Sequence, residues 1–192
     1  MYPARHVPYE RIDFVHPALD LVNSQHGVGR DLLEDERWLN DFLERWGYSD
    51  AATADAASLV ALRRLMRRIV ETVARGGRPA EPDLARLNGI LRGGRLAPVL
   101  AADGPEYELR LVSGRRDAAS LRAELAAALA ELLANGEPER LKVCDNPGCR
   151  FAFYDASRNR SRRWCSHTTC GNLDKVKRFR ARRRRESYSA SR

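Results

Sequence analysis

The sequence predicts an α+β protein, with a mostly helical N-terminal domain that contains one β-hairpin, followed by a small C-terminal module. Three observations support this class. Apolar residues recur at helical spacing through most of residues 17–134, one stretch over residues 96–112 alternates with a period of two, and all four cysteines lie in residues 144–170. With 192 residues and 43% hydrophobic content, the chain has room for one core and a separate small module.

Pro138 marks the boundary between the two parts. It follows an Asn-Gly pair that is typical of a helix end, and it precedes the cysteine-rich segment. We therefore expect three segments: a helical α+β domain over residues 1–138, the cysteine module over residues 139–186, and a flexible tail over residues 187–192.

The N-terminal domain opens with an irregular lead-in over residues 1–15 and a short first helix. Pro17 suits a first helical position, where its missing N–H costs nothing. We expect this helix to run to Asn23 and to break in the loop that holds Gly27 and Gly29.

The next two helices are amphipathic. The first is expected over residues 33–46, ends at the C-cap Gly47, and has a stripe at positions i, i+3, i+4 and i+7: Leu39, Phe42, Leu43 and Trp46. The second opens at Asp50 or Thr53 and ends near Arg75, with a longer stripe: Leu59, Leu62, Met66, Ile69 and Val73. Four arginines of this helix are expected largely off the stripe: Arg63, Arg64, Arg67 and Arg68.

A change of pattern follows a shorter helix expected over residues 82–91. Residues 96–101 and 107–112 predict a β-hairpin, because apolar and polar side chains alternate in its second strand. A two-stranded hairpin is marginal alone, so we expect it to pack on the helices or to pair with another strand. The last helix of the domain is expected over residues 117–134, with four leucines on its buried face: Leu121, Leu125, Leu129 and Leu132.

The four cysteines form two pairs, Cys144 with Cys149 and Cys165 with Cys170, each with four residues between its members. Short pairs of this kind can each supply two ligands to a tetrahedral zinc ion. We predict one structural zinc ion held by all four thiolates; a site in which His167 replaces one cysteine is the alternative. Free core thiols are disfavoured because the pairs lie in polar, turn-rich sequence, and no C-x-x-C redox motif is present.

Fifteen residues separate the two cysteine pairs, which is enough for a small hairpin. We expect its strands over residues 151–154 and 162–165, with a turn over residues 155–161. The second pair would then open a helix over residues 169–185. A knuckle, a hairpin and a helix that supplies ligands in its first turn is a treble-clef or zinc-ribbon-like arrangement.

Basic residues are concentrated in the C-terminal part. Residues 140–192 carry 16 Lys and Arg against 4 Asp and Glu, a net charge of +12, whereas residues 1–139 carry 18 against 22, a net charge of −4. A local cationic excess predicts a polyanionic partner. We expect contacts to nucleic-acid phosphates from ten residues of the turn and the helix: Arg158, Arg160, Arg162, Arg163, Lys175, Lys177, Arg178, Arg180, Arg182 and Arg183. A solvated face or a disordered tail is the alternative for the last arginines.

Several motifs of the module follow the pattern of one family. Beyond the four cysteines, they are Asp155, the triplet Ser-Arg-Asn at residues 157–159, SRRWCS at residues 161–166, and CGNL at residues 170–173. This pattern resembles the CGNR zinc finger, and the resemblance implies a finger that binds DNA. The chain departs from the pattern at Leu173, where the family has arginine. If that arginine contacts DNA in relatives, this chain has lost one contact.

The N-terminal part carries a second, shorter resemblance. The segment ALDLVNS at residues 18–24 and the helix that ends at Trp46-Gly47 are similar to the ABATE domain, which usually precedes this finger. That family is regarded as stress-induced transcription regulators, so the resemblance implies an N-terminal domain with a ligand pocket. Candidate pocket residues are Asp20, Asn23 and His26. The alternative is that these three side chains cap and hold the loop after the first helix.

Three classes of function follow. The leading hypothesis is a transcription regulator that binds DNA through the zinc module and senses an unidentified small-molecule effector, or mediates association, through its N-terminal domain. A zinc-dependent RNA-binding protein is the alternative, in which Phe151, Phe153 and Tyr154 would stack on bases. An enzyme is disfavoured, because the sequence has no nucleophile elbow, P-loop, dinucleotide-binding glycines or pair of metal-ligand histidines.

Association and location are less constrained. DNA-binding proteins are often two-fold homodimers, but no heptad repeat is sustained here, so the oligomeric state stays open. No apolar run approaches the ~18 residues of a membrane span, and residues 1–15 have no apolar signal core. We therefore expect a cytoplasmic protein with no membrane partner.

Overall fold

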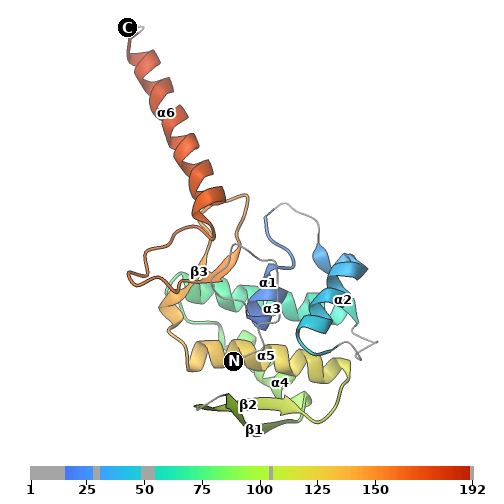
Figure 1. Ribbon diagram of the computed structural model, residues 1–192. Coiled ribbons are helices and arrows are strands. Elements are labelled where there is room, and N and C mark those ends of the chain that lie inside the picture. The colour runs from blue at the N-terminus through green and yellow to red at the C-terminus, as the bar shows by residue number, and fades with distance from the viewer. Residues whose placement is uncertain (1–15, 28–30, 49–54, 104–105, 191–192) are drawn as a thin grey trace.

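The computed structural model describes residues 16–27, 31–48, 55–103 and 106–190. The lead-in expected over residues 1–15, Gly29, and the helix starts expected at Asp50 or Thr53 lie outside these ranges. Within them, helices form the body of the molecule, a β-hairpin lies at one end and the last helix projects from the other (Figure 1). The predicted fold class is confirmed, because the structure contains two small sheets and a C-terminal cluster of cysteines in addition to the helices.

The elements of the body follow the predicted order. Its helices are α1 (Pro17–Asn23), α2 (Glu36–Arg45), α3 (Ala56–Ala74), α4 (Glu81–Gly93) and α5 (Ala118–Ala134), with a 3₁₀ turn, η1 (Leu32–Glu34), before α2. No helix in the described ranges is both long enough and apolar enough to cross a membrane.

Aspartates set the starts of three of these helices. The side chains of Asp35, Asp55 and Asp117 accept hydrogen bonds from the first backbone N–H groups of α2, α3 and α5. Because Asp31 caps the separate turn η1, α2 begins three residues later than predicted. The ends match the predictions more closely, since Gly47 and Gly76 take the left-handed conformation, with φ of 78° and 75°, that favours glycine after a helix.

Helix α5 is the central element of the core. Its four predicted leucines are buried, and so are several alanines between them: Ala123, Ala126, Ala127 and Ala128. Small side chains let neighbouring helices approach closely, and α1, α3 and α4 all contact α5. The stripes predicted for α2 and α3 also face this core, with Phe42, Met66 and Ile69 fully buried.

The predicted hairpin is present as β1 (Leu96–Asp103) and β2 (Glu106–Ser113), paired antiparallel from Leu96↔Ser113 to Asp103↔Glu106. Its base packs on α5, where the Ser113 and Ser120 hydroxyls hydrogen-bond to each other at 2.9 Å, and Ser113 also donates to the Gly94 carbonyl after α4 at 3.1 Å. The alternating apolar side chains of β2 do not enter the core, however: Tyr107 and Leu109 are 76% and 65% exposed. The hairpin is therefore anchored by one end only.

The sheet of the C-terminal module differs from the prediction. The turn η2 (Pro138–Arg140) leads into β3 (Leu141–Val143), which pairs antiparallel with β4 (Ala152–Tyr154). The strand expected over residues 162–165 does not form. The first cysteine pair reverses the chain, so the segments on either side of it become neighbours. The segment at 162–165 instead lies beside this knuckle, where the Arg163 carbonyl accepts a hydrogen bond from Asp145 N at 2.9 Å.

The second cysteine pair leads into the last helix, as predicted. A π-helical turn, η3 (His167–Gly171), contains Cys170 and continues directly into α6 (Asn172–Ala190). Residues 187–190, expected to belong to a flexible tail, are therefore helical. Figure 1 shows α6 extending away from the body, with the N-terminal end of the helix at the module.

Candidate metal centre and nucleic-acid interface

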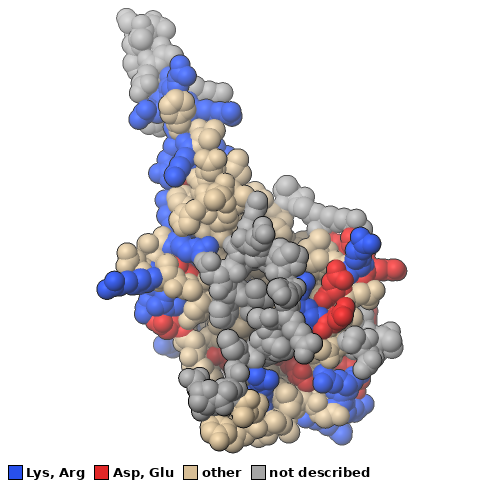
Figure 2. All heavy atoms as spheres, viewed as in Figure 1, with Lys and Arg blue, Asp and Glu red and all other residues tan. Residues whose placement is uncertain are grey.

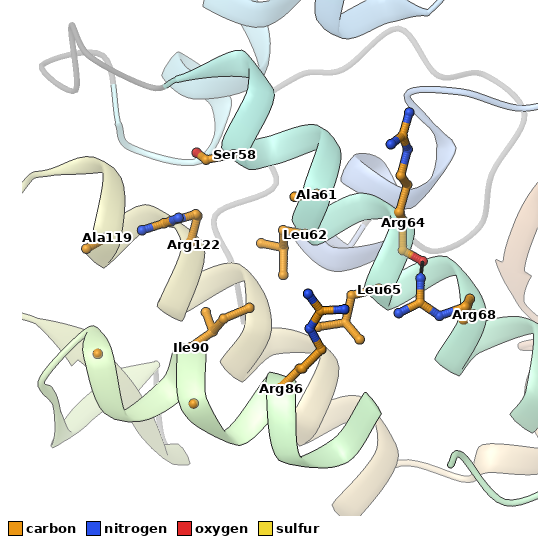
Figure 3. Close-up of a pocket in the computed structure, with 12 residues that line it drawn as sticks. Ser58, Ala61, Leu62, Arg64, Leu65, Arg68, Arg86, Ile90, Ala119 and Arg122 are labelled. Carbon is orange, nitrogen blue, oxygen red and sulfur yellow. Dashed lines mark hydrogen bonds between the residues drawn. The ribbon is translucent and has the colours of Figure 1, made fainter. Parts of the chain in front are cut away.

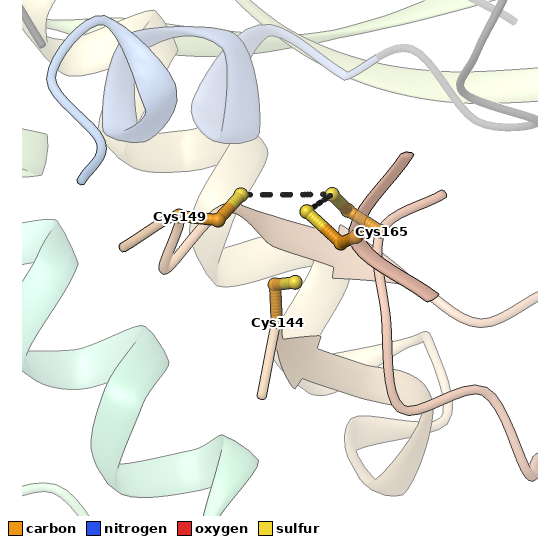
Figure 4. A group of neighbouring side chains, drawn as sticks. Cys144, Cys149 and Cys165 are labelled. Carbon is orange, nitrogen blue, oxygen red and sulfur yellow. Dashed lines mark hydrogen bonds between the residues drawn. The ribbon is translucent and has the colours of Figure 1, made fainter. Parts of the chain in front are cut away.

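The sulfur atoms of Cys144, Cys149, Cys165 and Cys170 all lie within 4.8 Å of one another. Figure 4 shows three of the side chains converging on a common space. The Sγ···Sγ distances are 3.7 Å between Cys149 and Cys165 and 3.9 Å between Cys165 and Cys170. These distances are too long for a disulfide and match the ~3.8 Å edge of a tetrahedron with Zn–S bonds of ~2.3 Å. The exposed His167 is not part of the cluster.

Electrostatics also favour a cation among these thiols. Hydrogen bonds from Cys149 and Cys165 lower the pKa of the Cys144 thiol, and the bond to Cys144 raises the pKa of the Cys149 thiol. Close thiolates therefore compete for ionisation, and a divalent cation removes the conflict by stabilising all of them together. The module holds one structural zinc ion, and four protein ligands leave no open position for catalysis.

The turn between β4 and Trp164 is organised by the buried carboxylate of Asp155. It accepts hydrogen bonds from Ser157 Oγ at 2.5 Å, Lys142 Nζ at 2.9 Å and Arg162 N at 2.9 Å. Burial alone would raise the pKa of Asp155, but these donors hold it well below its usual range. The turn therefore needs no β-ladder, because the Asp155 carboxylate binds backbone N–H groups of the turn from within.

The module is joined to the body by a pair of hydrogen bonds that mimic a β-bridge. The amide of Asn23, at the end of α1, donates to the Ala152 carbonyl and accepts from the Ala152 N–H, each at 2.8 Å. Both residues are buried, and Leu141 and Ala152 belong to the main hydrophobic core. The β3–β4 sheet is thus part of the same packed unit as α1 and α3.

Arginine side chains of α3 complete the junction. Arg67 donates to the backbone carbonyls of Val22 at 2.5 Å, Gln25 at 2.9 Å and Arg150 at 2.9 Å, and so links α1 to the first cysteine knuckle. The pKa of Arg67 is lowered, and burial of its guanidinium is the largest cause. A Cβ added at Gly27 would overlap the Gly148 carbonyl oxygen, so only glycine permits this close approach.

Arg63 was expected largely off the apolar stripe, but it is only 3% exposed. Its guanidinium makes two hydrogen bonds to Asp31, at 2.5 and 2.6 Å, and a third to Ser24 Oγ at 2.9 Å. Arg63 lies four residues after Leu59 and three before Met66, so helical spacing places it on the buried face. This pattern was readable in the sequence, whereas its partner Asp31 was not.

The three candidate pocket residues lie at separate junctions. Asp20 accepts hydrogen bonds from Arg45 at 2.8 Å and Trp46 at 3.1 Å, which ties α1 to α2, and burial raises its pKa against the effect of Arg45. Asn23 binds Ala152, and the His26 ring packs edge-on against Phe151. Their contacts are those of residues that hold the loop after α1. A ligand at these residues stays a prediction.

The ten predicted cationic contacts divide into two groups. In the turn, Arg160 pairs with Glu137 and with Glu139 at 2.5 Å, Arg163 pairs with Asp145 at 2.7 Å, and Arg162 is half-buried over the Phe153 ring. Arg158 is exposed, with no carboxylate partner in the described part of the chain. Most cations of the turn therefore serve the module itself.

The cations of α6 are more available. Lys175, Lys177 and Arg180 are exposed and pair with no carboxylate among the residues that the structure describes, while Arg178 pairs with Asp174 one turn away. Arg182 and Arg183 lie over the Phe179 ring. Figure 2 shows Lys and Arg side chains along the projecting helix, whereas the body carries both basic and acidic side chains. Leu173, where the resembling family has arginine, is 53% exposed at the start of α6.

Comparison with known families divides the chain at the same place as its sequence patterns. The CGNR zinc finger profile matches residues 140–183. The ABATE profile, described as "Putative stress-induced transcription regulator", matches residues 15–136, well over half of the chain. No individual curated protein is significantly similar to the sequence.

Proposed function

The chain belongs to the ABATE family and ends in a CGNR zinc finger, and from this premise we propose that it is a DNA-binding transcription regulator. The zinc module binds the DNA, and the N-terminal domain binds a small-molecule effector. The proposal places the protein in the cytoplasm, with the chromosome, and gives it no catalytic role.

The single observation that carries this proposal is the exposed, cationic helix α6. It has 19 residues, so it is about 28 Å long, and it leaves the body at the zinc ion. A lone helix of this width fits the major groove, and cations on its sides can reach the phosphates. The zinc ligand Cys170 lies in the turn that continues into α6, so metal binding sets the direction of the helix.

The internal pairing of the turn cations refines the proposed interface. We assign the phosphate contacts mainly to six residues of α6: Lys175, Lys177, Arg178, Arg180, Arg182 and Arg183. Of these, Arg178 must exchange its pairing with Asp174 for a phosphate. If all six neutralise phosphates, log K should fall with log salt at a slope of about −5. Arg160 and Arg163 contribute chiefly by stabilising the turn against acidic neighbours.

The burial of aromatic residues favours duplex DNA over single-stranded RNA. Phe153 is buried and Phe151 is half-buried in the cluster around the cysteines, and the Tyr154 hydroxyl accepts a hydrogen bond from Glu137 N. Base stacking on single strands needs exposed aromatic faces. The three aromatics proposed for RNA stacking are therefore occupied within the fold.

The test is a competition experiment with the zinc-loaded full chain. Fluorescence anisotropy should be recorded with a selected duplex and with single-stranded RNA, over a salt series. We expect tighter binding to the duplex, and the double variant Lys177→Ala/Arg180→Ala should make the salt slope shallower by about 2. Arg37→Ala/Arg78→Ala removes the same two charges at exposed positions of α2 and of the segment between α3 and α4, and is the matched control for net charge. Equal affinity for both nucleic acids would refute the DNA-regulator proposal.

A further inference from the structure

A cavity of about 620 Å³ opens between α3 and α4, with Ala119 and Arg122 of α5 at one side (Figure 3). None of the three candidate pocket residues near α1 lines it. Its volume lies in the range typical of small-molecule sites. Each helix contributes residues at helical spacing, such as Arg86, Gly89, Ile90 and Gly93 of α4, so one continuous face of each helix is turned toward the cavity.

The floor of the cavity is apolar. Leu62 and Leu65 of α3 and Ile90 of α4 lie side by side beneath the opening. The first two are buried and Ile90 is half-buried, so they form an ordered surface. Such a floor favours a ligand with a hydrocarbon or aromatic portion.

The rim of the cavity is cationic. Four arginines line it: Arg64, Arg68, Arg86 and Arg122. Arg68 is held by Asp83, with hydrogen bonds of 2.7 and 3.1 Å. Within the described ranges the other three form no salt bridge, although Asp83 also attracts Arg86 and Asp31 attracts Arg64 at longer range. In Figure 3, Arg86 extends from α4 toward α3, whereas Arg64 points away from the floor. A group bound above the floor would therefore meet Arg86 first, with Arg68 and Arg122 to either side.

Glycines keep one wall of the cavity open. A Cβ added at Gly89 or at Gly93 would meet no atom within 4 Å, so the space in front of both positions is empty of protein. Glycine inside a helix costs about 1 kcal/mol relative to alanine, and Gly89 lies well within α4. The open wall is thus maintained at the expense of helix stability.

We propose that this cavity binds a small organic anion, with a carboxylate or phosphate head held by Arg86 and its arginine neighbours and an apolar body on Leu62, Leu65 and Ile90. Guanidinium groups bind both head groups through paired hydrogen bonds. In Figure 1 α4 lies at the end of the body away from α6, so a duplex on α6 would not cover the opening. The regulatory meaning of the site rests on the proposed function, whereas the binding itself does not.

Octyl phosphate, below its micelle concentration, is a suitable probe because it joins both features. Isothermal titration with the zinc-loaded full chain should give one site per chain. Octyl glucoside keeps the tail without the charge, and inorganic phosphate keeps the charge without the tail. We expect each to bind at least about tenfold more weakly than octyl phosphate. Equal binding of either control compound would overturn the proposed combination of charged rim and apolar floor.

Two variants locate the site. Arg86→Gln/Arg122→Gln should weaken octyl phosphate by about tenfold or more, and Gly89→Leu should block it by filling the cavity while favouring the helix. Ala85→Leu adds the same side chain at an exposed position of α4 that does not line the cavity, and should bind normally. Unchanged binding in Gly89→Leu would place the anion elsewhere and refute the assignment.

Octyl phosphate binding and duplex binding, both measured on the zinc-loaded full chain, distinguish failure of this inference from failure of the proposed function. If octyl phosphate does not bind while the duplex does, the cavity assignment fails and the DNA-binding role stands. If octyl phosphate binds but the protein has no preference for duplex DNA, the cavity stands and the regulator proposal fails. A shift in duplex affinity on saturation with octyl phosphate, absent in Gly89→Leu, would support both.

Discussion

The two ends of the zinc module differ in how they meet the rest of the molecule. The β3–β4 end is built into the helical body, where Asn23 binds Ala152 from α1 and Leu141 lies in the main core. The α6 end projects into solvent, and its exposed apolar residues Leu173 and Phe179 touch no core. One metal site therefore lies between a fixed end and a free end. The zinc site therefore fixes the orientation of α6 relative to the helical body. It is not the centre of a finger that folds separately from that body.

Loss of zinc should have the largest effect, because it disturbs both ends at once. Structural zinc sites contribute apparent binding energies of about 10–16 kcal/mol in zinc-finger peptides, and the cluster around the cysteines has few other buried residues. We expect Cys165→Ser to lower zinc content below one per chain, to abolish duplex binding, and to lower the thermal midpoint of the whole chain. Metal analysis and circular dichroism measure these changes. A variant with an unchanged midpoint would show that the fixed end does not depend on the metal.

The Arg63–Asp31 pair offers the next largest effect, confined to the helical body to which the fixed end is attached. Asp31→Asn leaves a buried guanidinium without its charge partner, and should cost about 3 kcal/mol at neutral pH in urea unfolding. Hydrogen bonds from Arg63 hold the pKa of Asp31 below its usual range, so its contribution is present above that range and is lost as pH falls through the lowered value. The difference in unfolding free energy between the unmodified protein and Asp31→Asn should therefore disappear at acidic pH. Asp41→Asn, at an exposed position of α2, is the control.

The hydrogen bonds between Asn23 and Ala152 allow the attachment of the module to the body to be tested separately from the metal site. Asn23→Ala removes two buried hydrogen bonds and leaves the Ala152 N–H and carbonyl unsatisfied, which should cost about 2–3 kcal/mol. The four thiolates are untouched, so zinc content should stay at one per chain. Asn88→Ala, at an exposed position of α4, should change the unfolding free energy little. Loss of zinc from the Asn23 variant would mean that the fixed end also holds the metal site together.

Two substitutions at the module test the free end with the smallest effects. Leu173→Arg restores the residue of the resembling family at an exposed position of α6, and should steepen the salt slope of duplex binding by about 1. Arg160→Ala removes a cation that is paired with Glu137 and Glu139, and should leave the slope nearly unchanged. Thermal midpoints should move little in either variant. If Arg160→Ala made the salt slope shallower than alanine at a cation of α6 does, the phosphate contacts would lie on the turn and not on the helix.

Local sequence signals predicted much of this molecule. Helical stripes, the alternating hairpin and the aspartate and glycine boundaries depend on residues close together in the chain. The zinc ligands followed from spacing and residue type in the same way. The pairing of β3 with β4 was missed, because it depends on the reversal at the Cys144–Cys149 knuckle and on docking against Asn23, a residue 129 positions away from Ala152.

The sequence by itself therefore determined which segments are helical, which four side chains bind the metal, and where positive charge is concentrated. Tertiary structure alone decided which of those charges stay available, because carboxylates distant in the chain, such as Glu137 beside Arg160, neutralise some of them. It also placed Arg86 of α4 and Arg122 of α5 around the apolar floor of one cavity. Charge and periodicity are properties of the chain, whereas partnership between charges is a property of how distant segments pack.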